Sequence, residues 1–294
     1  MTTHLVTFSD ESMSRARRLC SDSGLAHGID SAARYDDEML TDRWDWNPDW
    51  SAQRGFGYWR WKPLLIETQI RQLSDNDTLI YADAGVEFIN NVNYIIDRMG
   101  HEKPQDDIWL FGNNWEHAHW CKRDVVQAIW PSKWWRPNLE FHSDKAVTWE
   151  RFGKQVQASV IFLRVSEYSR RFVSEWLDWC LTGVRIGAAV SFGRDNPEHR
   201  DGRMTWSKFR YLIDDSESVF PNHPEFREHR HDQAILTTLA YREGIKLHYW
   251  PAVYNKGGTP EFVYEKLPEY AGDDYPSPLF SHHRKRDHEW ERKA

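Results

Sequence analysis

Three groups of polar side chains in this sequence have residue types and positions that suit chemistry. The first is Asp83, which follows the short apolar run 78–82 and precedes Ala84 and Gly85. A carboxylate at the carboxyl end of a buried strand lies where an open α/β sheet binds its ligand. Glycine beside it lets backbone come close to that ligand. An Asp that only caps the following turn is the alternative, and these residues alone leave both open.

The second group is Asp232 and Gln233, at the polar start of a helix predicted from the apolar residues at 235, 236 and 239. A helix start favours Asp through its dipole and through capping, so a purely structural role is the alternative. The third group is the run from His282 to Arg286. Guanidinium groups match phosphate geometry well, whereas a solvated basic tail is the alternative.

The elements that position these groups are predicted from apolar runs and from glycine and proline. A glycine-hinged aromatic loop at 54–61 leads into a helix that opens at Lys62 and Pro63, where proline suits the first turn. Strands are predicted at 4–8, 78–82, 107–111, 155–164 and 245–249. Further helices are predicted at 11–23, 92–99, 116–135 and 167–181.

Composition limits the classes of function. The chain has 294 residues, which suits one large domain or two small ones, and its net charge of −7 argues against nucleic acid as a partner. It contains no long apolar run and no signal-peptide pattern, so a cytoplasmic protein is predicted. Three widely spaced cysteines predict neither a disulfide framework nor a zinc site. The 17 tryptophans can stack on sugar rings and nucleobases, or simply fill the core.

The block from Gly55 to Pro63, followed by the strand end from Tyr81 to Gly85, resembles the core of the GT-A class of nucleotide-sugar glycosyltransferases. It is similar to the corresponding block of bacterial polysaccharide-type transferases. The resemblance implies an α/β fold of GT-A type, a single Rossmann-like mixed sheet flanked by helices, in one domain over 1–294. In most GT-A enzymes this strand ends in Asp-x-Asp. The second carboxylate is missing here, which puts a metal in doubt.

Two later segments also resemble this class. The segment from Asp232 to Leu236 is similar to the Asp-Gln-Asp-Ile-Leu type of segment in the retaining group related to glycogenin, with Ala234 in place of the second Asp. In that group the Asp and Gln lie beside the anomeric carbon of the donor, so Asp232 and Gln233 are predicted to be catalytic. A C-terminal His ligates the metal in the same group, which here implies His282 or His283.

The resemblance thus implies a donor site and a cation. The divalent cation, Mn²⁺ or Mg²⁺, would be held by Asp83 with His282 or His283 and recruited with the nucleotide. Gln157 and Ala158, at the start of the 155–164 strand, are further candidates to face the sugars. Ser9 has a plain helix cap as its alternative. The residues expected to contact the nucleotide sugar are Thr7, Phe8, Ser9, Lys62, Asp83, Ala84, Gly85, Ser159, Arg284, Lys285 and Arg286.

The function implied is transfer of a sugar from a nucleotide-diphosphate donor, preferably UDP-linked, to a hydroxyl of a glycan or lipid-linked glycan in surface polysaccharide synthesis. The segment 183–230 is then an acceptor-side insertion, and peripheral membrane contact stays open. Retention at the anomeric carbon is preferred to inversion, with both open. Two alternatives are a non-catalytic carbohydrate-binding protein and a metal-dependent hydrolase built on Asp83, His231, Asp232 and a C-terminal His. The hydrolase lacks a close-spaced ligand motif such as His-Glu-x-x-His.

Overall fold

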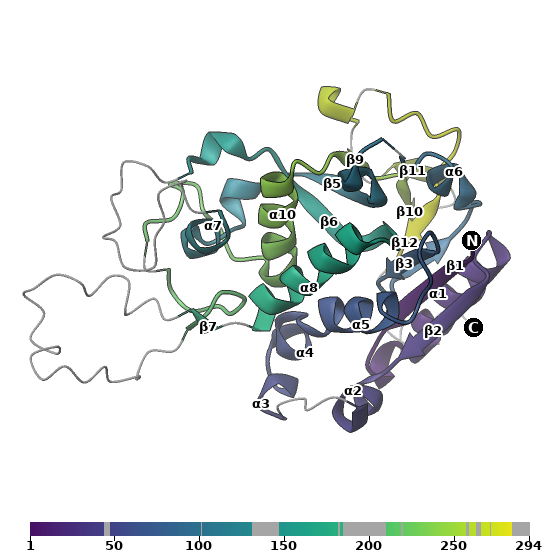
Figure 1. The fold of residues 1–294 in the computed structure, drawn as a ribbon, viewed down its shortest axis with the longest axis horizontal. Coiled ribbons are helices and arrows are strands. Elements are labelled where there is room, and N and C mark those ends of the chain that lie inside the picture. Colours follow the sequence, from purple (N-terminus) through teal and green to yellow (C-terminus); the bar gives the residue numbers. More distant parts are fainter. Residues whose placement is uncertain are drawn as a thin grey trace, which may run out of the picture.

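The computed structural model describes residues 1–43, 48–100, 102–130, 147–181, 183–184, 210–218, 220–256, 259–262, 266–270 and 272–283. Its main sheet has six strands in the order β2-β1-β3-β6-β5-β9 (Figure 1). These strands are β1 (Thr3–Phe8), β2 (Ser31–Tyr35), β3 (Thr78–Ala82), β5 (Ile108–Glu116), β6 (Lys154–Arg164) and β9 (Leu247–Tyr249). β1 pairs parallel with β2 and β3, whereas β6 runs antiparallel to β3 and β5. The predicted mixed α/β sheet flanked by helices is confirmed.

Strands β3 and β6 lie at the centre of this sheet, and both are buried along nearly their whole length. All five residues of β3 are buried, and β6 is buried from Gln155 to Arg164. Alternate side chains of β3 point to opposite faces, as the pleat requires: Leu79 and Tyr81 join one core cluster, and Ile80 and Ala82 join the other. A strand covered on both faces shows this continuous apolar pattern.

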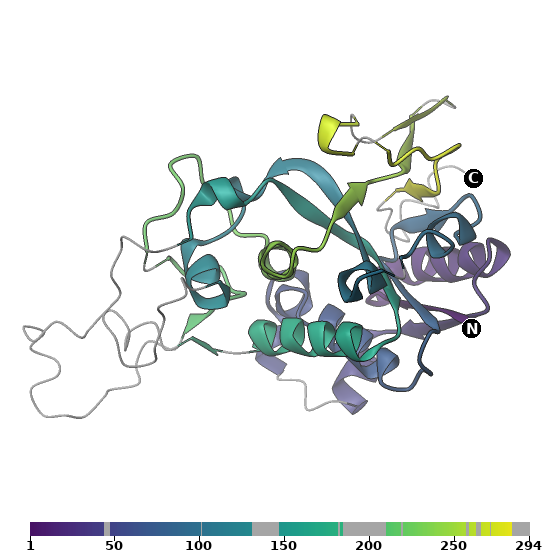
Figure 2. The same ribbon diagram turned by 45° about the horizontal axis from the view of Figure 1, so that its top comes forward.

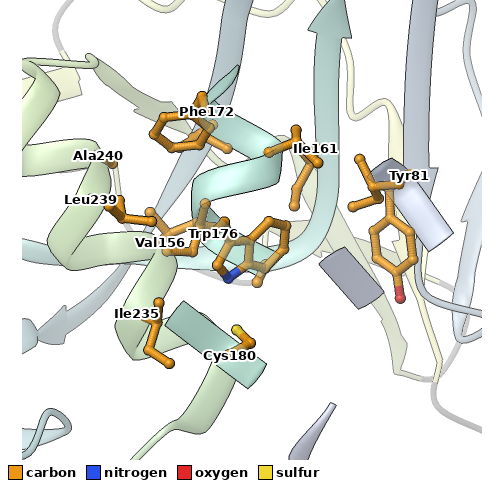
Figure 3. Packing of buried hydrophobic residues seen from close by; sticks show 14 of the residues in the cluster. Tyr81, Val156, Ile161, Phe172, Trp176, Cys180, Ile235, Leu239 and Ala240 are labelled. Carbon is orange, nitrogen blue, oxygen red and sulfur yellow. The ribbon is translucent and has the colours of Figure 1, made fainter. Parts of the chain in front are cut away.

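Helices cover both faces of the sheet. On one face lie α5 (Trp61–Ile70), α7 (Arg123–Ile129), α8 (Glu167–Leu181) and α10 (His231–Glu243). Trp176 of α8 packs there among residues of β6 and α10, including Val156 and Ile235 (Figure 3). The other face carries α1 (Ser14–Ala26) and α6 (Asn93–Ile96). This second cluster also includes Trp109 and Trp250, so these tryptophans serve the core.

A second sheet joins distant parts of the chain. It has the strand order β11-β10-β12-β4, with β4 at Val86–Phe88, β10 at Ala252–Lys256, β11 at Thr259–Phe262 and β12 at Phe280–His282. The C-terminal strands, yellow in Figure 2, lie across the main sheet from α8. Strand β12 pairs antiparallel with β4, so His282 lies opposite Val86. His282 is buried, which corrects the alternative of a solvated tail at this residue.

Other elements differ from the sequence-based predictions. Strand β5 continues to Glu116, so within 116–130 the helix expected over 116–135 is replaced by the short turn η3 (His117–His119) and α7, and residues 131–135 lie outside the described part. The loop at 54–61 contains a short helix, α4 (Arg54–Tyr58), in which Gly55, Phe56 and Gly57 have positive φ. Strand β2 was not expected. In 183–230, β7 (Gly183–Val184) pairs with β8 (Arg210–Tyr211), while residues 185–209 lie outside the described part. None of the described helices is long and apolar enough to cross a membrane.

Candidate active site

A cleft of about 720 Å³ opens at the carboxyl ends of β1 and β3. Its walls also come from α4, from the middle of β6 and from the N-terminus of α10. The predicted site residues that line it are Phe8, Ser9, Lys62, Asp83, Ala84, Gly85, Ala158, Ser159, Asp232, Gln233 and His282. Segments separated by up to 274 positions in the chain, from Phe8 to His282, therefore meet here.

Five predicted site residues and the further candidate Gln157 are absent from the cleft lining or lie outside the described residues. Thr7 is fully buried and does not line the cleft, because it alternates with Val6 and Phe8 and points to the other face of β1. His283 is held beside the cleft, where its backbone N–H donates to the carbonyl of Gly85 at 2.9 Å. The predicted phosphate-binding residues Arg284, Lys285 and Arg286 lie outside the part that the structure describes.

Lys62 joins the two carboxylates at the floor of the cleft. Its Nζ lies 3.3 Å from Oδ1 of Asp83 and 3.4 Å from Oδ2 of Asp232, and it donates to the carbonyl of Ala158 at 3.0 Å. The Lys62 side chain is only 5% exposed, so the ammonium depends on these partners for its solvation. The prediction placed Lys62 among the residues that contact the nucleotide sugar. The structure places its ammonium between two carboxylates.

Burial sets the protonation of this group of side chains. For Lys62, burial lowers the pKa, but Asp232 and Asp83 outweigh that effect and the net pKa is raised. For Asp232, burial raises the pKa to about 6, with Lys62 opposing the rise and Asp83 adding to it. Burial likewise raises the pKa of Tyr81, whose hydroxyl donates to Asp83. Asp232 therefore changes charge within reach of neutral pH.

A row of buried polar side chains on β6 leads to the cleft, which Ser159 lines. Gln233 donates through Nε2 to Oε1 of Gln155 at 2.7 Å, and Gln157 donates to the hydroxyl of Ser159 at 2.9 Å. Residues 155, 157 and 159 share one face of the strand because successive side chains alternate. Gln155 was not a predicted site residue. The alternation of side chains along a strand could have identified Gln155, because it lies on the same face as Gln157 and Ser159.

One wall of the cleft is aromatic and has an unusual backbone. Phe56, Tyr58, Trp59 and His231 all have φ between 48° and 60°, a region that non-glycine residues rarely adopt. The His231 ring stacks on Tyr58 at 4.8 Å and on Trp59 at 5.5 Å, and its Nδ1 donates to the carbonyl of Ile213. Such strain gathers at functional sites when surrounding packing maintains it. Sequence analysis named His231 only for the hydrolase alternative and did not predict Phe56 and Trp59 as cleft residues.

A band of aromatic and guanidinium groups runs outward from the cleft. Arg230 lines the cleft, and its guanidinium lies 4.5 Å from the ring of Trp120 and 4.9 Å from that of Trp115. The two indoles stack on each other at 4.9 Å. Trp115 is 36% exposed, which is high for an indole in a stack. We call Trp115, Trp120 and Arg230 the aromatic band.

The cleft fits a divalent cation only in part. Asp83 and His282 both line it, as the metal prediction requires. No third carboxylate, imidazole or thiol joins them to form a compact ligand group within the described residues. The neighbouring Lys62 already neutralises part of the charge on Asp83. A cation here would therefore need oxygen ligands from the donor, and the metal stays a prediction.

Comparison with known proteins gives likeness of structure but not of sequence. No protein-family model matches this sequence, and no curated protein matches it. The chain is similar to the apo structure of WbbM, a bifunctional glycosyltransferase, with 10% identity and a TM-score of 0.47 over 97% of this chain. It spans only 46% of WbbM, about half the length of that protein.

Two further solved structures are similar over nearly the whole chain. Mouse xyloside xylosyltransferase 1, in its apo form, is 12% identical with a TM-score of 0.43, covering 97% of this chain and 98% of the other. The galactosyltransferase LgtC, in complex with donor and acceptor sugar analogues, is 11% identical with a TM-score of 0.40, covering 96% and 87%.

Proposed function

We propose that this protein is a glycosyltransferase that moves a sugar from a nucleotide-diphosphate donor, UDP-linked in our preferred form, to a hydroxyl of a glycan. The observation that carries the proposal is the group Asp83, Lys62 and Asp232 at the floor of an aromatic-walled cleft. A volume of about 720 Å³ suits a ligand of nucleotide-sugar size. Two carboxylates held 3.3–3.4 Å from one ammonium suit a polar ligand that carries hydroxyl groups.

The donor is proposed to lie along the cleft with its nucleoside near Phe8 and Ser9. Phe8 packs against Trp61 with ring centroids 4.1 Å apart, which offers an apolar surface beside the strand-end carboxylate. Asp83 would accept hydrogen bonds from ribose hydroxyls, since an ionised carboxylate only accepts. The diphosphate would extend toward His282, from which the chain continues into the basic residues 284–286.

The sugar is proposed to lie against Asp232 and Gln233. As the anomeric bond breaks, positive charge develops on the sugar and negative charge on the diphosphate. An ionised Asp232 would stabilise the sugar, and its pKa of about 6 leaves it mostly ionised at neutral pH. Gln233 is held in place through Gln155. A bound Mn²⁺ or Mg²⁺ would neutralise the diphosphate as it leaves.

The stereochemical course has two forms in this proposal. In the retaining form, which we prefer, the leaving phosphate accepts the proton of the acceptor hydroxyl. In the inverting form, Asp232 is the general base, a role for which a pKa of about 6 is suitable. Proton NMR of the product anomer distinguishes the two forms.

The acceptor glycan is proposed to lie over the aromatic band. Indole faces pack well against the C–H faces of sugar rings, and Trp115 is exposed enough to be reached. Arg230 belongs both to the cleft and to the band, so an acceptor that begins at Trp115 would lead toward Asp232. Synthesis of surface polysaccharide, or of a lipid-linked glycan at a membrane surface, would use such a polymeric acceptor.

Turnover of a panel of nucleotide sugars tests the proposal. Release of nucleoside diphosphate from UDP- and GDP-sugars would be followed with oligosaccharide acceptors, in EDTA and after Mn²⁺ add-back. We expect turnover of at least one donor, loss of turnover in Asp232→Asn, and retention of turnover in Asp22→Asn, a control on the surface of α1. A carbohydrate-binding protein would give no turnover with any donor. A hydrolase would cleave glycosides or phosphate esters that lack a nucleotide.

A further inference from the structure

A second cluster of potential ligands lies away from the cleft. His119, His223 and Glu225 each offer one ligand atom, and these atoms lie within 4.8 Å of one another. Nε2 of His119 is 2.8 Å from Oε2 of Glu225, and the rings of His119 and His223 are 5.3 Å apart. None of the three lines the cleft. We propose that these residues form a binding site for a borderline transition-metal ion such as Zn²⁺.

The backbone holds the three side chains together without the ion. The N–H of Phe226 donates to the carbonyl of His223 at 2.8 Å, closing a turn with Pro224 at its second position. Proline fixes φ there and is favoured in such turns. The N–H of Arg227 then donates to the carbonyl of His119 at 2.8 Å. The turn that presents His223 and Glu225 is thus bonded directly to the residue that provides the third ligand.

The loop before this turn is also fastened, to the start of α7. The N–H of Phe220 donates to Oδ1 of Asp124 at 3.0 Å, and the N–H of Arg123 donates to Oδ1 of Asn222 at 2.8 Å. Contacts on both sides of His223 therefore fix its position relative to His119. A set of ligands on a fixed backbone loses less conformational freedom on binding than a chance surface cluster would.

The ligand set favours a particular class of ion. Imidazole nitrogen suits Zn²⁺, Cu²⁺ and Ni²⁺, whereas Ca²⁺ and Mg²⁺ prefer oxygen alone. Glu225 is 71% exposed, so its side chain can turn toward the ion, and water can reach the remaining positions. The N–H of Glu225 donates to Nδ1 of His223 at 3.1 Å. Coordination through either ring nitrogen ends that contact, because Nδ1 then holds the ion or carries the ring proton.

The ion would link two segments that are over 100 positions apart, beside the approach to the cleft. Residues after Glu225 lead directly to Arg230, which lines the cleft, and to His231 at the start of α10. The site is therefore proposed to steady the segment 222–230. Its ligands are separate from Asp83 and His282, so it is independent of the donor cation and of the proposed transfer reaction.

The test is titration of the full-length, tag-free chain with Zn²⁺ and with Co²⁺ after removal of bound metal, in the absence of nucleotide. We expect one equivalent to bind, with the visible absorption of Co²⁺ held by nitrogen and oxygen. His119→Ala and His223→Ala should each weaken Zn²⁺ binding by more than about tenfold, since disturbing even an outer-shell partner has that effect. Hydrogen exchange in 222–230 should slow on Zn²⁺ addition.

Two controls separate this site from others on the chain. Asp83→Ala, in the cleft, and His27→Ala, whose ring bonds to the Ser23 carbonyl on α1, should keep wild-type Zn²⁺ affinity. Glu225→Gln changes an exposed side chain and is expected to fold, so its weakened binding is informative if a His variant does not fold. Absence of one-equivalent binding by the wild type, or unchanged affinity in the folded ligand variants, would overturn the proposal.

Discussion

The charge on Asp232 depends on three features of its surroundings. Burial raises its pKa, Lys62 at 3.4 Å lowers it, and Asp83 raises it again, with a result of about 6. Asp232 sits in the first turn of α10, where the helix dipole favours its ionised form. A carboxylate in this setting is ready to take or release a proton close to neutral pH.

The raised pKa of Asp232 predicts a specific pH dependence of stability. The unfolded chain releases this proton near the ordinary value of 3.8 and the folded chain near 6, so the folded state binds more protons in between. The contribution of Asp232 to the free energy of unfolding therefore falls as pH rises from about 4 to about 6, by on the order of 3 kcal/mol, and stays low above that. The free energy of unfolding of the wild type minus that of Asp232→Asn, measured by denaturant unfolding at each pH, should show this fall.

A second variant checks the assignment. Lys62 lowers the pKa of Asp232, so Lys62→Met should raise that pKa and extend the falling window above pH 6. Carboxyls with a lowered pKa, such as Glu175 and Asp273, make the free energy of unfolding rise with pH. Both proteins share this contribution, so it cancels when the value for Asp232→Asn is subtracted from that of the wild type. A difference curve that is flat between pH 4 and 6 would contradict the raised pKa of Asp232.

The sequence predicted the site residues whose signal is local. Asp83 follows a buried strand and Asp232 opens a helix, and both positions follow from neighbouring residues. The ion pairs of Lys62 with both carboxylates could not be predicted in this way, because they form only after three segments of the chain have packed together. The left-handed conformation of His231 was not predictable either, since it is imposed by contacts with Tyr58 and Ile213.

At the scale of elements, α4 shapes the aromatic wall of the cleft. Gly55 has φ of 62°, and a Cβ placed there would lie 2.4 Å from the indole of Trp59. Trp59 itself caps α4 in the left-handed region and stacks on His231. The glycine is thus required both by the backbone and by close packing with a residue of the cleft wall.

Replacing Gly55 with alanine should therefore cost more than backbone strain alone. Gly244 is a matched control, since it has φ of 70° and nothing within 4 Å of its added Cβ. Gly244→Ala should destabilise by about 1–2 kcal/mol, the left-handed penalty, and Gly55→Ala by more because Trp59 must move. Urea unfolding compares the two. Equal losses of stability in the two variants would contradict this prediction, because they would show that moving Trp59 has no measurable cost.

The aromatic band makes a separate prediction for substrate use. Trp115→Ala removes the exposed ring of the stack without touching the residues at the floor of the cleft. The KM for an oligosaccharide acceptor should rise by about tenfold, as loss of about 1–1.5 kcal/mol of ring stacking implies. The KM for the donor should stay unchanged. A rise in donor KM alone would place the band outside the acceptor site.

A strand was predictable where the apolar pattern of its own sequence agrees with the extent of its pairing in the sheet. The β6 strand was predicted at 155–164 and begins one residue earlier; its second half contains the continuous apolar run Val160–Leu163. The β5 strand was expected to stop before Gly112, yet it continues, because hydrogen bonds to β6 and β9 maintain it through that glycine. Tyr270 occupies the space where a Cβ at Gly112 would lie. Neither partner strand nor Tyr270 is close in sequence.

At the scale of the whole molecule, the pairing of β4 with β12 connects the N-terminal half to the C-terminal region. Phe280 is fully buried and packs against Phe88 across this pair. This sheet was not predicted, because its strands are three to five residues long and its β4–β12 pair joins residues almost 200 positions apart. It brings His282 to the cleft, so the C-terminal region belongs to the site.

Two truncations separate the structural part of this region from its proposed binding part. Ending the chain after His283 leaves β12 intact, so thermal stability should hold while affinity for nucleoside diphosphate falls through loss of Arg284, Lys285 and Arg286. Ending it after Leu279 removes the buried Phe280 and should cost at least about 3 kcal/mol. Undiminished diphosphate affinity after the first truncation would assign no binding role to the basic run.

Calorimetric titration with UDP and with GDP tests the central claim most directly, because it asks whether the cleft around Asp83 binds a nucleoside diphosphate. The comparison is between wild type and Asp83→Ala, with Asp22→Asn as the surface control and unfolding temperature as the check on folding. We predict one site in the wild type and in the control, and at least about tenfold weaker binding in folded Asp83→Ala, equivalent to about 1.4 kcal/mol or more. Equal affinity in wild type and Asp83→Ala, or no binding of either nucleotide by the wild type, would contradict the account.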